Sequence, residues 1–335
     1  MRAIFDVPAP AKINLFLHVV GRRADGYHLL QSAFMLIDWC DTLHFERRAD
    51  ARLSRHDLND PLPADDLCLR AARALQAASG CRSGVDISID KQLPSGAGMG
   101  GGSSDAGSTL LALNRLWNLN WPRARLQEIA LPLGADVPFF VGGRNAWVEG
   151  IGERLTPINL PEEWLAVVKP AASIPTAAIF ASPLLVKSTE AATILGFLAS
   201  AGVSGNSAAG NSGDCSDGLA SANDCNEKGR NGNGCNGCNG YGRNDLQPAA
   251  EAACAEVAEV GRWLTAHFGN SRMTGSGSAV FARAGFRFDD AAPGRGAERP
   301  PEAMLPQVLP AGWVGRMCRS LVHHPLAGWA HDKAS

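Results

Sequence analysis

The sequence predicts an α+β protein of two domains, and three observations lead to this expectation. The chain has 335 residues, 45% of them hydrophobic, which is enough for roughly two hydrophobic cores. Strand-like and helical segments alternate without the regular repeat that a wound parallel sheet requires. A glycine-rich segment at 94–107 lies between a strand-like and a helical segment. These features together favour a globular protein with a glycine-rich loop in its first half.

The first half of the chain begins with strand-like sequence. Residues 11–20 place Lys12, Asn14 and His18 between apolar neighbours, which predicts a strand with one polar edge. A turn is expected at 23–26, because Asp-Gly tolerates positive φ. The segments expected next are an apolar stretch at 33–39 leading into 42–46, a helix at 67–78 and a strand at 85–89. A helix is then expected through Leu110, Leu113 and Trp117, with Ser103 or Ser104 as its N-cap. It is followed by a helix at 123–130 and strand-like sequence at 137–148.

We expect a first domain over residues 1–156 and a second over 157–323. The second domain should contain a strand at 164–168, a helix opening at 176–180, a long helix at 249–268 and a short strand at 278–282. It is interrupted at 202–243, where glycine and asparagine fill 19 of 42 positions. Such sequence buries too little apolar surface to offset its ordering entropy, so a disordered insertion is predicted.

Four cysteines within the insertion leave a zinc site as an alternative. Only Cys235 and Cys238 have ligand spacing, whereas closed structural zinc sites usually pair two such knuckles. We therefore expect no metal ligands in this segment.

Composition excludes several classes of protein. The formal net charge of −2 lacks the basic excess of a dedicated nucleic-acid binder. No apolar run approaches the ~18 residues of a membrane helix, and Asp6, Pro8 and Pro10 interrupt any signal peptide. An odd count of nine cysteines favours reduced thiols over disulfides. We expect a cytoplasmic protein that binds neither nucleic acid nor membranes and that does not require an oligomer.

The segment from Pro94 to Gly107 has the composition of a phosphate-binding loop. Glycines allow an anion to approach the backbone closely, and a following helix N-terminus supplies free N–H groups. A flexible linker is the alternative, but the flanking strand and helix argue against it. A Walker motif is excluded because no lysine follows. A dinucleotide fingerprint fits the glycines but lacks its acidic residue, since 117–122 contains none.

Lys12 and Asp136 are candidate catalytic residues. Alone, Lys12 would be assigned to the surface and Asp136, in Gly-Ala-Asp-Val-Pro, to a turn. Next to a phosphate loop, the two residues fit one reaction. Phosphoryl transfer needs a base for the attacking hydroxyl and a cation near the transferring group, and an aspartate and a lysine can supply them.

Three segments resemble the motifs of the GHMP kinases and occur in the same order. They are Pro-Ala-Pro-Ala-Lys-Ile-Asn-Leu-Phe-Leu at 8–17, Pro-Ser-Gly-Ala-Gly-Met-Gly-Gly-Gly-Ser-Ser-Asp-Ala at 94–106, and Thr-Gly-Ser-Gly-Ser-Ala-Val-Phe at 274–281. Further motifs at 22–28, 134–138 and 174–180 are similar to those of the members that phosphorylate a cytidine diphosphate derivative of methylerythritol. The resemblance implies a ribosomal-protein-S5-like N-terminal domain, a ferredoxin-like C-terminal domain, ATP as phosphoryl donor, and Mg²⁺ with the nucleotide.

The resemblance also implies roles for individual residues. Asp136 takes the position of the catalytic base and Lys12 that of its partner, which polarises the substrate hydroxyl. Tyr27 and Phe180 fall where two aromatic rings sandwich the cytosine, and His28 where its polar edge is read. Asn14 and Thr176 fall near the methylerythritol, and no metal-ligating residue is implied.

The phosphate loop is implied to bind ATP through a continuous run of residues. These are Pro94, Ser95, Gly96, Ala97, Gly98, Met99, Gly100, Gly101, Gly102, Ser103 and Ser104. The motif at 274–277 is expected to form the floor under the phosphates, with a plain tight turn as the alternative, and Asn244-Asp245 is expected to be structural. Rival functions are a homoserine, mevalonate or sugar kinase of the same fold, a nicotinamide-dependent oxidoreductase, and an inactive nucleotide-binding module.

Overall fold

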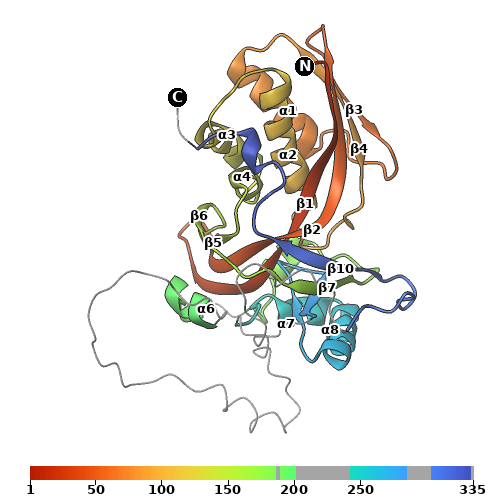
Figure 1. Cartoon of the computed structure of the whole chain (residues 1–335). Coiled ribbons are helices and arrows are strands. Elements are labelled where there is room, and N and C mark those ends of the chain that lie inside the picture. The colour runs from red at the N-terminus through yellow and green to blue at the C-terminus, as the bar shows by residue number, and fades with distance from the viewer. Residues whose placement is uncertain (186–188, 201–241, 285–302, 333–335) are drawn as a thin grey trace.

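The computed structural model describes residues 1–185, 189–200, 242–284 and 303–332 (Figure 1). The predicted insertion lies outside these residues up to position 241, together with its cysteines. Its last two residues are described, and the Arg243 carbonyl accepts a hydrogen bond from the Leu17 amide at 2.9 Å. The segment that packs against the first strand therefore includes Arg243.

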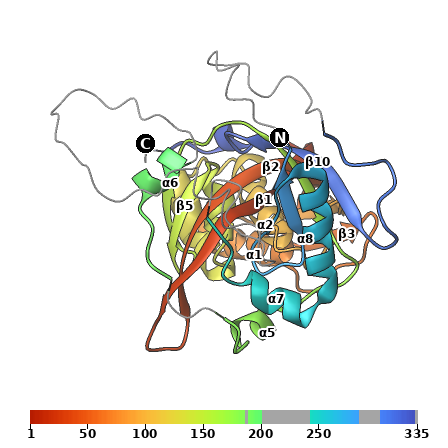
Figure 2. The same cartoon turned by 90° about the horizontal axis from the view of Figure 1, so that it is seen from below.

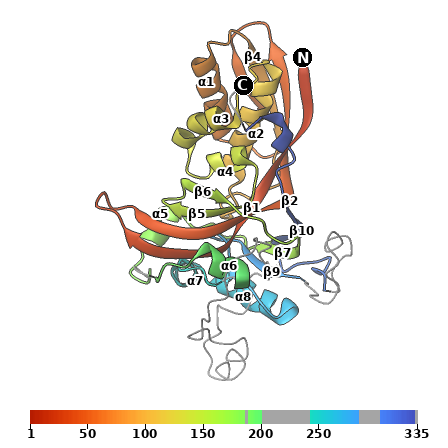
Figure 3. The same cartoon turned by 60° about the vertical axis from the view of Figure 1, so that its left-hand side comes forward.

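A long hairpin of two antiparallel strands organises the molecule. β1 (Ala3–Arg22) and β2 (His28–Arg48) are joined at the predicted turn, and the predicted strand at 11–20 is the inner part of β1. Figures 1 and 3 show this hairpin running through both halves of the molecule. The other strands are β3 (Leu53–Asp57), β4 (Gly84–Asp90), β5 (Ala146–Gly150), β6 (Arg154–Pro157), β7 (Trp164–Lys169), β8 (Arg272–Met273), β9 (Val280–Arg283) and β10 (Val314–Leu321).

The strands form one sheet in the order β3-β4-β2-β10-β7-β9-β8, with β1 and β5 also paired to β2, and β6 to β5. β10 connects the two ends of the sheet, because it pairs with β2 on one side and with β7 on the other. The residues after β10 return to the first half of the chain, where Leu326 and Ala330 join its core. The division into two domains at residue 156 stays a prediction.

Helices cover the sheet at both ends (Figures 1 and 2). They are α1 (Leu67–Ser79), α2 (Gly101–Leu116), α3 (Arg123–Ala130), α4 (Val137–Gly142), α5 (Thr176–Phe180), α6 (Ile194–Ser200), α7 (Gln247–Ala253) and α8 (Ala255–Phe268), with 3-10 turns at Leu131–Leu133 and Ala327–Trp329. One core lies between α1, α2 and strands β1, β2 and β4, and another lies between α7, α8 and strands β7 to β9. The predicted α+β class is confirmed.

Three local predictions are corrected. Residues 137–148 are not a continuous strand, because α4 occupies 137–142 before β5 begins. Pro138 suits the first helical turn and Gly143, at φ 71°, ends the helix. α4 is buried on every side, so its sequence carries no 3.6-residue period to distinguish it from a buried strand.

The other two corrections concern a break within an expected helix and the start of α2. The expected helix at 249–268 is two helices, because Cys254 adopts an extended conformation between α7 and α8. Neither Ser103 nor Ser104 caps α2, which begins at Gly101 with Gly100 in the left-handed conformation at its N-cap. A glycine can take this φ at no steric cost, so the helix starts earlier than the serines suggest.

Candidate active site

The phosphate loop lies between β4 and α2 and depends on left-handed backbone at three glycines. Gly96, Gly98 and Gly100 have φ values of 66°, 74° and 73°. The N–H groups of the first turn of α2 have no partner within the helix, and the helix dipole favours negative charge there. This arrangement can bind the phosphates of a nucleotide.

The motif at 274–277 packs directly against the loop. The Ser278 amide donates to the Gly96 carbonyl and the Ala279 amide to the Ala97 carbonyl, each at 3.2 Å. Asn244 fixes this motif in turn, because its Nδ2 donates to the Met273 and Gly275 carbonyls at 2.8 Å. The contacts are in keeping with a supporting role for both motifs.

Gly98→Ala is expected to raise KM for ATP by about tenfold and to lower the melting temperature. A Cβ at Gly98 would lie 2.5 Å from the Thr274 carbonyl oxygen, so either the loop or the motif beneath it must move. Steady-state kinetics and thermal unfolding measure both effects. Gly80→Ala is the matched control, because Gly80 has φ 66° but a Cβ there would meet no atom within 4 Å. Equal ATP affinity in the two variants would contradict a phosphate-binding role for this backbone.

Lys12 and Asp136 meet beside the phosphate loop. The Lys12 side chain is 5% exposed, and its Nζ lies 3.5 Å from Asp136 Oδ2. Nζ also donates to Asn14 Oδ1 at 2.6 Å and lies 4.3 Å from the centre of the Phe34 ring. The Lys12 amide donates to the Met99 carbonyl at 3.0 Å, so the lysine also contacts the loop through its backbone.

The two members of this pair differ in their exposure. Asp136 precedes α4 and remains 29% exposed, whereas Lys12 is enclosed. The ammonium holds the carboxylate in position, and the carboxylate stays open to a bound molecule. Such a pair can accept a proton from a hydroxyl at Asp136 and place positive charge next to a phosphoryl group.

Side chains of the phosphate loop point in different directions. Ala97 and Met99 are buried in the core behind the loop, so they offer only their backbone to a ligand. Ser104 is also buried, and its hydroxyl donates to the Pro10 carbonyl at 2.6 Å. Ser103 is half-buried at the start of α2. The Ser104 hydroxyl is therefore bonded to β1, and the predicted contact of Ser104 with the nucleotide would use its backbone.

Tyr27 and His28 lie where the β1–β2 hairpin turns, and Phe180 is the last residue of α5. Figure 3 shows α5 close to this hairpin. The His28 and Phe180 rings are stacked, with centroids 5.2 Å apart and an interplanar angle of 23°. Tyr27 is 61% exposed, and its carbonyl accepts a hydrogen bond from the Arg23 amide at 2.7 Å. The structure thus brings His28 and Phe180 together and leaves the Tyr27 ring accessible.

Asn14 binds a residue that the sequence did not single out, whereas Thr176 contacts the expected motif at 274–277. Asn14 Nδ2 donates to Ser32 Oγ at 2.8 Å, and Thr176 Oγ1 lies 2.7 Å from Ser276 Oγ. Phe34, beneath Lys12, was missed as well, although it is the antiparallel partner of Asn14. Only the register between β1 and β2 could have identified Ser32 and Phe34 as neighbours of Asn14 in advance.

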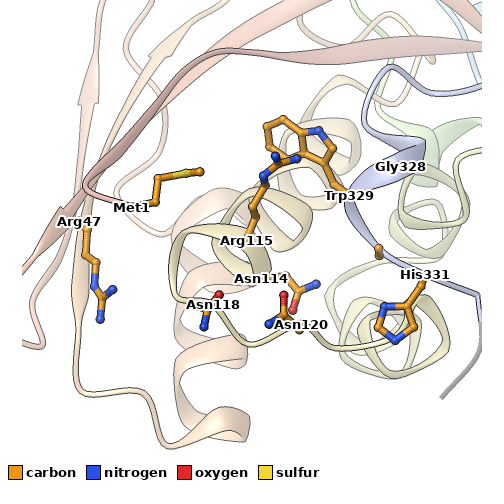
Figure 4. A pocket seen from close by; sticks show the side chains of 10 residues that line it. Met1, Arg47, Asn114, Arg115, Asn118, Asn120, Gly328, Trp329 and His331 are labelled. Atoms are coloured by element: carbon orange, nitrogen blue, oxygen red, sulfur yellow. The ribbon is translucent and has the colours of Figure 1, made fainter. Parts of the chain in front are cut away.

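A separate pocket of about 740 Å³ opens at the other end of α2 (Figure 4). It is lined by polar and aromatic side chains that include Arg47, Arg115, Asn118, Trp329 and His331. α2 has 16 residues, about 24 Å of helix at 1.5 Å per residue. The pocket is therefore remote from the phosphate loop, and none of the predicted site residues lines it.

Neither a metal-ligand cluster nor a membrane-spanning helix occurs in the described part of the chain. Across its four described ranges, no group of three or more histidine, cysteine, aspartate or glutamate side chains is arranged to hold a metal ion. Among the helices of those ranges, none is long and apolar enough to cross a membrane.

Comparison with known proteins gives one consistent family. The model of the GHMP kinases N terminal domain matches residues 66–144. The 4-diphosphocytidyl-2-C-methyl-D-erythritol kinase of Methylibium petroleiphilum is 57% identical over 98% of this chain and 99% of its own length. The protein of the same name from Verminephrobacter eiseniae is 53% identical over 99% of this chain and all of its own length.

Solved structures agree with the sequence relatives. A crystal structure of 4-(cytidine 5'-diphospho)-2C-methyl-D-erythritol kinase superposes with a TM-score of 0.65 at 31% identity, covering 84% of this chain and 90% of the other. Homoserine kinase from Cytophaga hutchinsonii has a TM-score of 0.58 at 14% identity, covering 96% and 95% of the two chains, a likeness of fold alone.

Proposed function

Since the chain belongs to the 4-diphosphocytidyl-2-C-methyl-D-erythritol kinase family of GHMP kinases, we propose that it phosphorylates the 2-hydroxyl of 4-diphosphocytidyl-2-C-methyl-D-erythritol. ATP is the phosphoryl donor, and the products are the 2-phosphate and ADP. The reaction is a step of the non-mevalonate, or methylerythritol phosphate, pathway to isopentenyl diphosphate. The observation that supports this activity most directly in the structure is the Lys12–Asp136 pair beside the phosphate loop.

The proposed mechanism assigns one task to each part of the site. The backbone N–H groups of 96–103 and the N-terminus of α2 hold the β- and γ-phosphates. Asp136 accepts the proton of the substrate 2-hydroxyl, and the oxygen of this hydroxyl forms a bond to the γ-phosphorus of ATP. The bond between the γ-phosphorus and the oxygen that bridges it to the β-phosphate breaks, and ADP leaves. Lys12 positions Asp136 and stabilises negative charge on the transferring group.

Mg²⁺ is proposed to accompany the nucleotide. It would neutralise charge on the phosphate oxygens, and Mg²⁺ sites often use one or two carboxylates plus substrate phosphates. Asp136 is the one carboxylate among the predicted site residues, and it pairs with Lys12 and is proposed as the base. The triphosphate and water would therefore furnish the ligands of the ion.

The Tyr27, His28 and Phe180 cluster is proposed to bind the cytosine. A planar base is well held between aromatic faces, and each stacking contact contributes ~1–3 kcal/mol. The His28 imidazole covers one face of the Phe180 ring. A base that enters between Tyr27 and Phe180 must therefore stack on the other face of Phe180 or displace the imidazole from the first. In either case His28 lies close to the edge of the base, where it can form a hydrogen bond.

Tyr27→Ala is expected to raise KM for the cytidyl substrate by about tenfold, because it removes one stacking face. The effects on kcat and on KM for ATP should be smaller, since Tyr27 lies on the hairpin end and not at the Lys12–Asp136 pair. Tyr27→Phe retains the ring and serves as the control, with an expected KM near that of the unaltered enzyme. An unchanged KM in Tyr27→Ala would remove the tyrosine from the cytosine site.

The substrate assignment is tested by measuring ADP release with three acceptors in parallel. Turnover is expected with 4-diphosphocytidyl-2-C-methyl-D-erythritol and not with mevalonate or homoserine, which lack a planar base for the aromatic cluster. Turnover with mevalonate or homoserine alone would overturn the assignment. ATP binding without turnover of any acceptor would indicate a nucleotide-binding module.

A further inference from the structure

Three buried titratable residues join the two ends of the phosphate loop. Lys91 lies just before the loop, Asp105 just after it in α2, and Asp41 in β2 beneath it. Lys91 Nζ donates to Asp105 Oδ2 at 2.6 Å and to Asp41 Oδ2. The side chains of Lys91, Asp41 and Asp105 are 11%, 0% and 3% exposed. We call these three residues the loop clamp.

Asp41 has the contacts of an ionised carboxylate. Its Oδ1 accepts hydrogen bonds from the Gln92 amide at 2.6 Å and the Leu93 amide at 2.7 Å. Its Oδ2 accepts from the Lys91 ammonium. Several donors on one carboxyl group, one of them charged, favour its anionic form. Asp41 therefore fixes the chain as it enters the loop.

Asp105 has fewer hydrogen-bond donors than Asp41, and the Lys91 ammonium that contacts it is shared with Asp41. Asp105 Oδ1 is buried and has no hydrogen-bond partner among the residues that the structure describes. Burial raises the pKa of Asp105, and the neighbouring Asp41 carboxyl raises it further, whereas Lys91 lowers it. Both carboxyl groups contact the same Lys91 ammonium, so they lie close together, and like charges at this distance disfavour ionisation of both.

The other groups that face Asp105 supply no second cation. Cys68 of α1 is fully buried, and burial raises the pKa of its thiol, so it is neutral. Thr109, one turn along α2, is an uncharged hydroxyl, and Asp66 near Cys68 is paired with Arg55 at 2.8 Å. A single lysine thus faces two aspartates, and ionisation of both would leave one uncompensated negative charge in a buried site.

We propose that Asp41, Lys91 and Asp105 act as a clamp that holds the phosphate loop closed, with Asp41 ionised and Asp105 neutral, so that no net charge lies beneath the nucleotide phosphates. All three are positioning residues, since they act through the loop backbone. The inference rests on the proposed function only in treating 94–104 as a nucleotide-phosphate loop. It concerns ATP affinity and is independent of the identity of the acceptor.

The consequence is an asymmetry between two chemically identical substitutions. Asp105→Asn replaces a neutral acid by a neutral amide of the same shape, so the dissociation constant for ATP at pH 7 should stay within about threefold of the original. Asp41→Asn removes the anion that holds Lys91, Gln92 and Leu93, so it should weaken ATP binding by about tenfold or more. KM for the acceptor should change little in either variant, because the clamp does not approach the aromatic cluster.

A second consequence is a dependence on pH. As the pH rises through the elevated pKa of Asp105, the clamp acquires a negative charge and ATP binding should weaken. This weakening should be absent in Asp105→Asn, which has no proton to lose. A purely structural role of Asp105 would not produce a difference between these two pH profiles.

The experiment measures ATP dissociation constants by calorimetry from pH 6.5 to 9.5, with melting temperatures and steady-state kinetics alongside. The proposal is supported by tight binding in Asp105→Asn, weak binding in Asp41→Asn, and loss of the alkaline change in Asp105→Asn. Equal weakening in both variants would mean that Asp105 is ionised, and no weakening in either would mean that there is no clamp. If Asp41→Asn does not fold, the pH profiles of the unaltered enzyme and Asp105→Asn decide the question. Failure of the cytidyl substrate in the kinetic assay would refute the proposed acceptor and leave the binding measurements valid.

Discussion

Replacing Asp136 by asparagine is expected to lower kcat by about 10²-fold or more while ATP binds with nearly unchanged affinity. Asparagine has the shape of aspartate but cannot accept a proton from the substrate hydroxyl. The carboxylate lies at the start of α4, 3.5 Å from Lys12 Nζ, and forms no part of the loop backbone that is proposed to hold the phosphates. The loss should therefore fall on the chemical step.

Pre-steady-state phosphoryl transfer and ATP titration separate these two effects. Asp65→Asn provides a matched control, because Asp65 is exposed and pairs only with Arg73 on the surface of the described structure. Its kcat should equal that of the unaltered enzyme. A kcat close to normal in Asp136→Asn would remove Asp136 from the role of base.

Lys12→Met is expected to lower kcat by a similar factor of about 10² and, in addition, to weaken ATP binding. Methionine keeps much of the length of the side chain, so it can fill the space over Phe34 and beside Gly100. It cannot donate to Asn14 Oδ1 or attract the Asp136 carboxylate, which the ammonium does at 2.6 and 3.5 Å. Both the position of the base and the charge next to the transferring phosphoryl group are lost.

The double variant distinguishes a coupled pair from two independent residues. If Lys12 acts largely through Asp136, the double variant should be scarcely slower than Asp136→Asn, because residues that work as a unit are not additive. Melting temperatures show whether the buried substitution disturbs the fold. Multiplicative losses in the double variant would contradict the coupling, and full activity in Lys12→Met would contradict the role of the lysine.

The sequence alone predicted most features that depend on short stretches of chain. The inner part of β1, helices α1 and α3, strand β4 and the phosphate loop are visible in local periodicity, turn residues and glycine content. These signals are local because backbone conformation is set mainly by the residues themselves and their near neighbours. Lys12 and Asp136 were identified because both stand in short motifs, and the structure places them together.

Local signals were insufficient where burial removes periodicity. α4 was predicted as a strand because it is apolar throughout, and β10 was not predicted at all. β10 pairs with both β2 and β7, and its role as a connection between the two ends of the sheet depends on partners that are far away in sequence. Tertiary pairing, and not the propensity of residues 314–321, determines that strand.

The detailed chemistry of the site was decided by the tertiary structure. The Asn14 amide donates to Thr274 Oγ1 across 260 positions of sequence, and Lys91 reaches Asp41 across 50. Residue spacing in the sequence does not predict such contacts, because they form and become stabilising only when the sheet has assembled and water is excluded from them. The sequence thus determined which residues could perform phosphoryl transfer, and the packed structure decided which buried charges face one another beneath the phosphate loop.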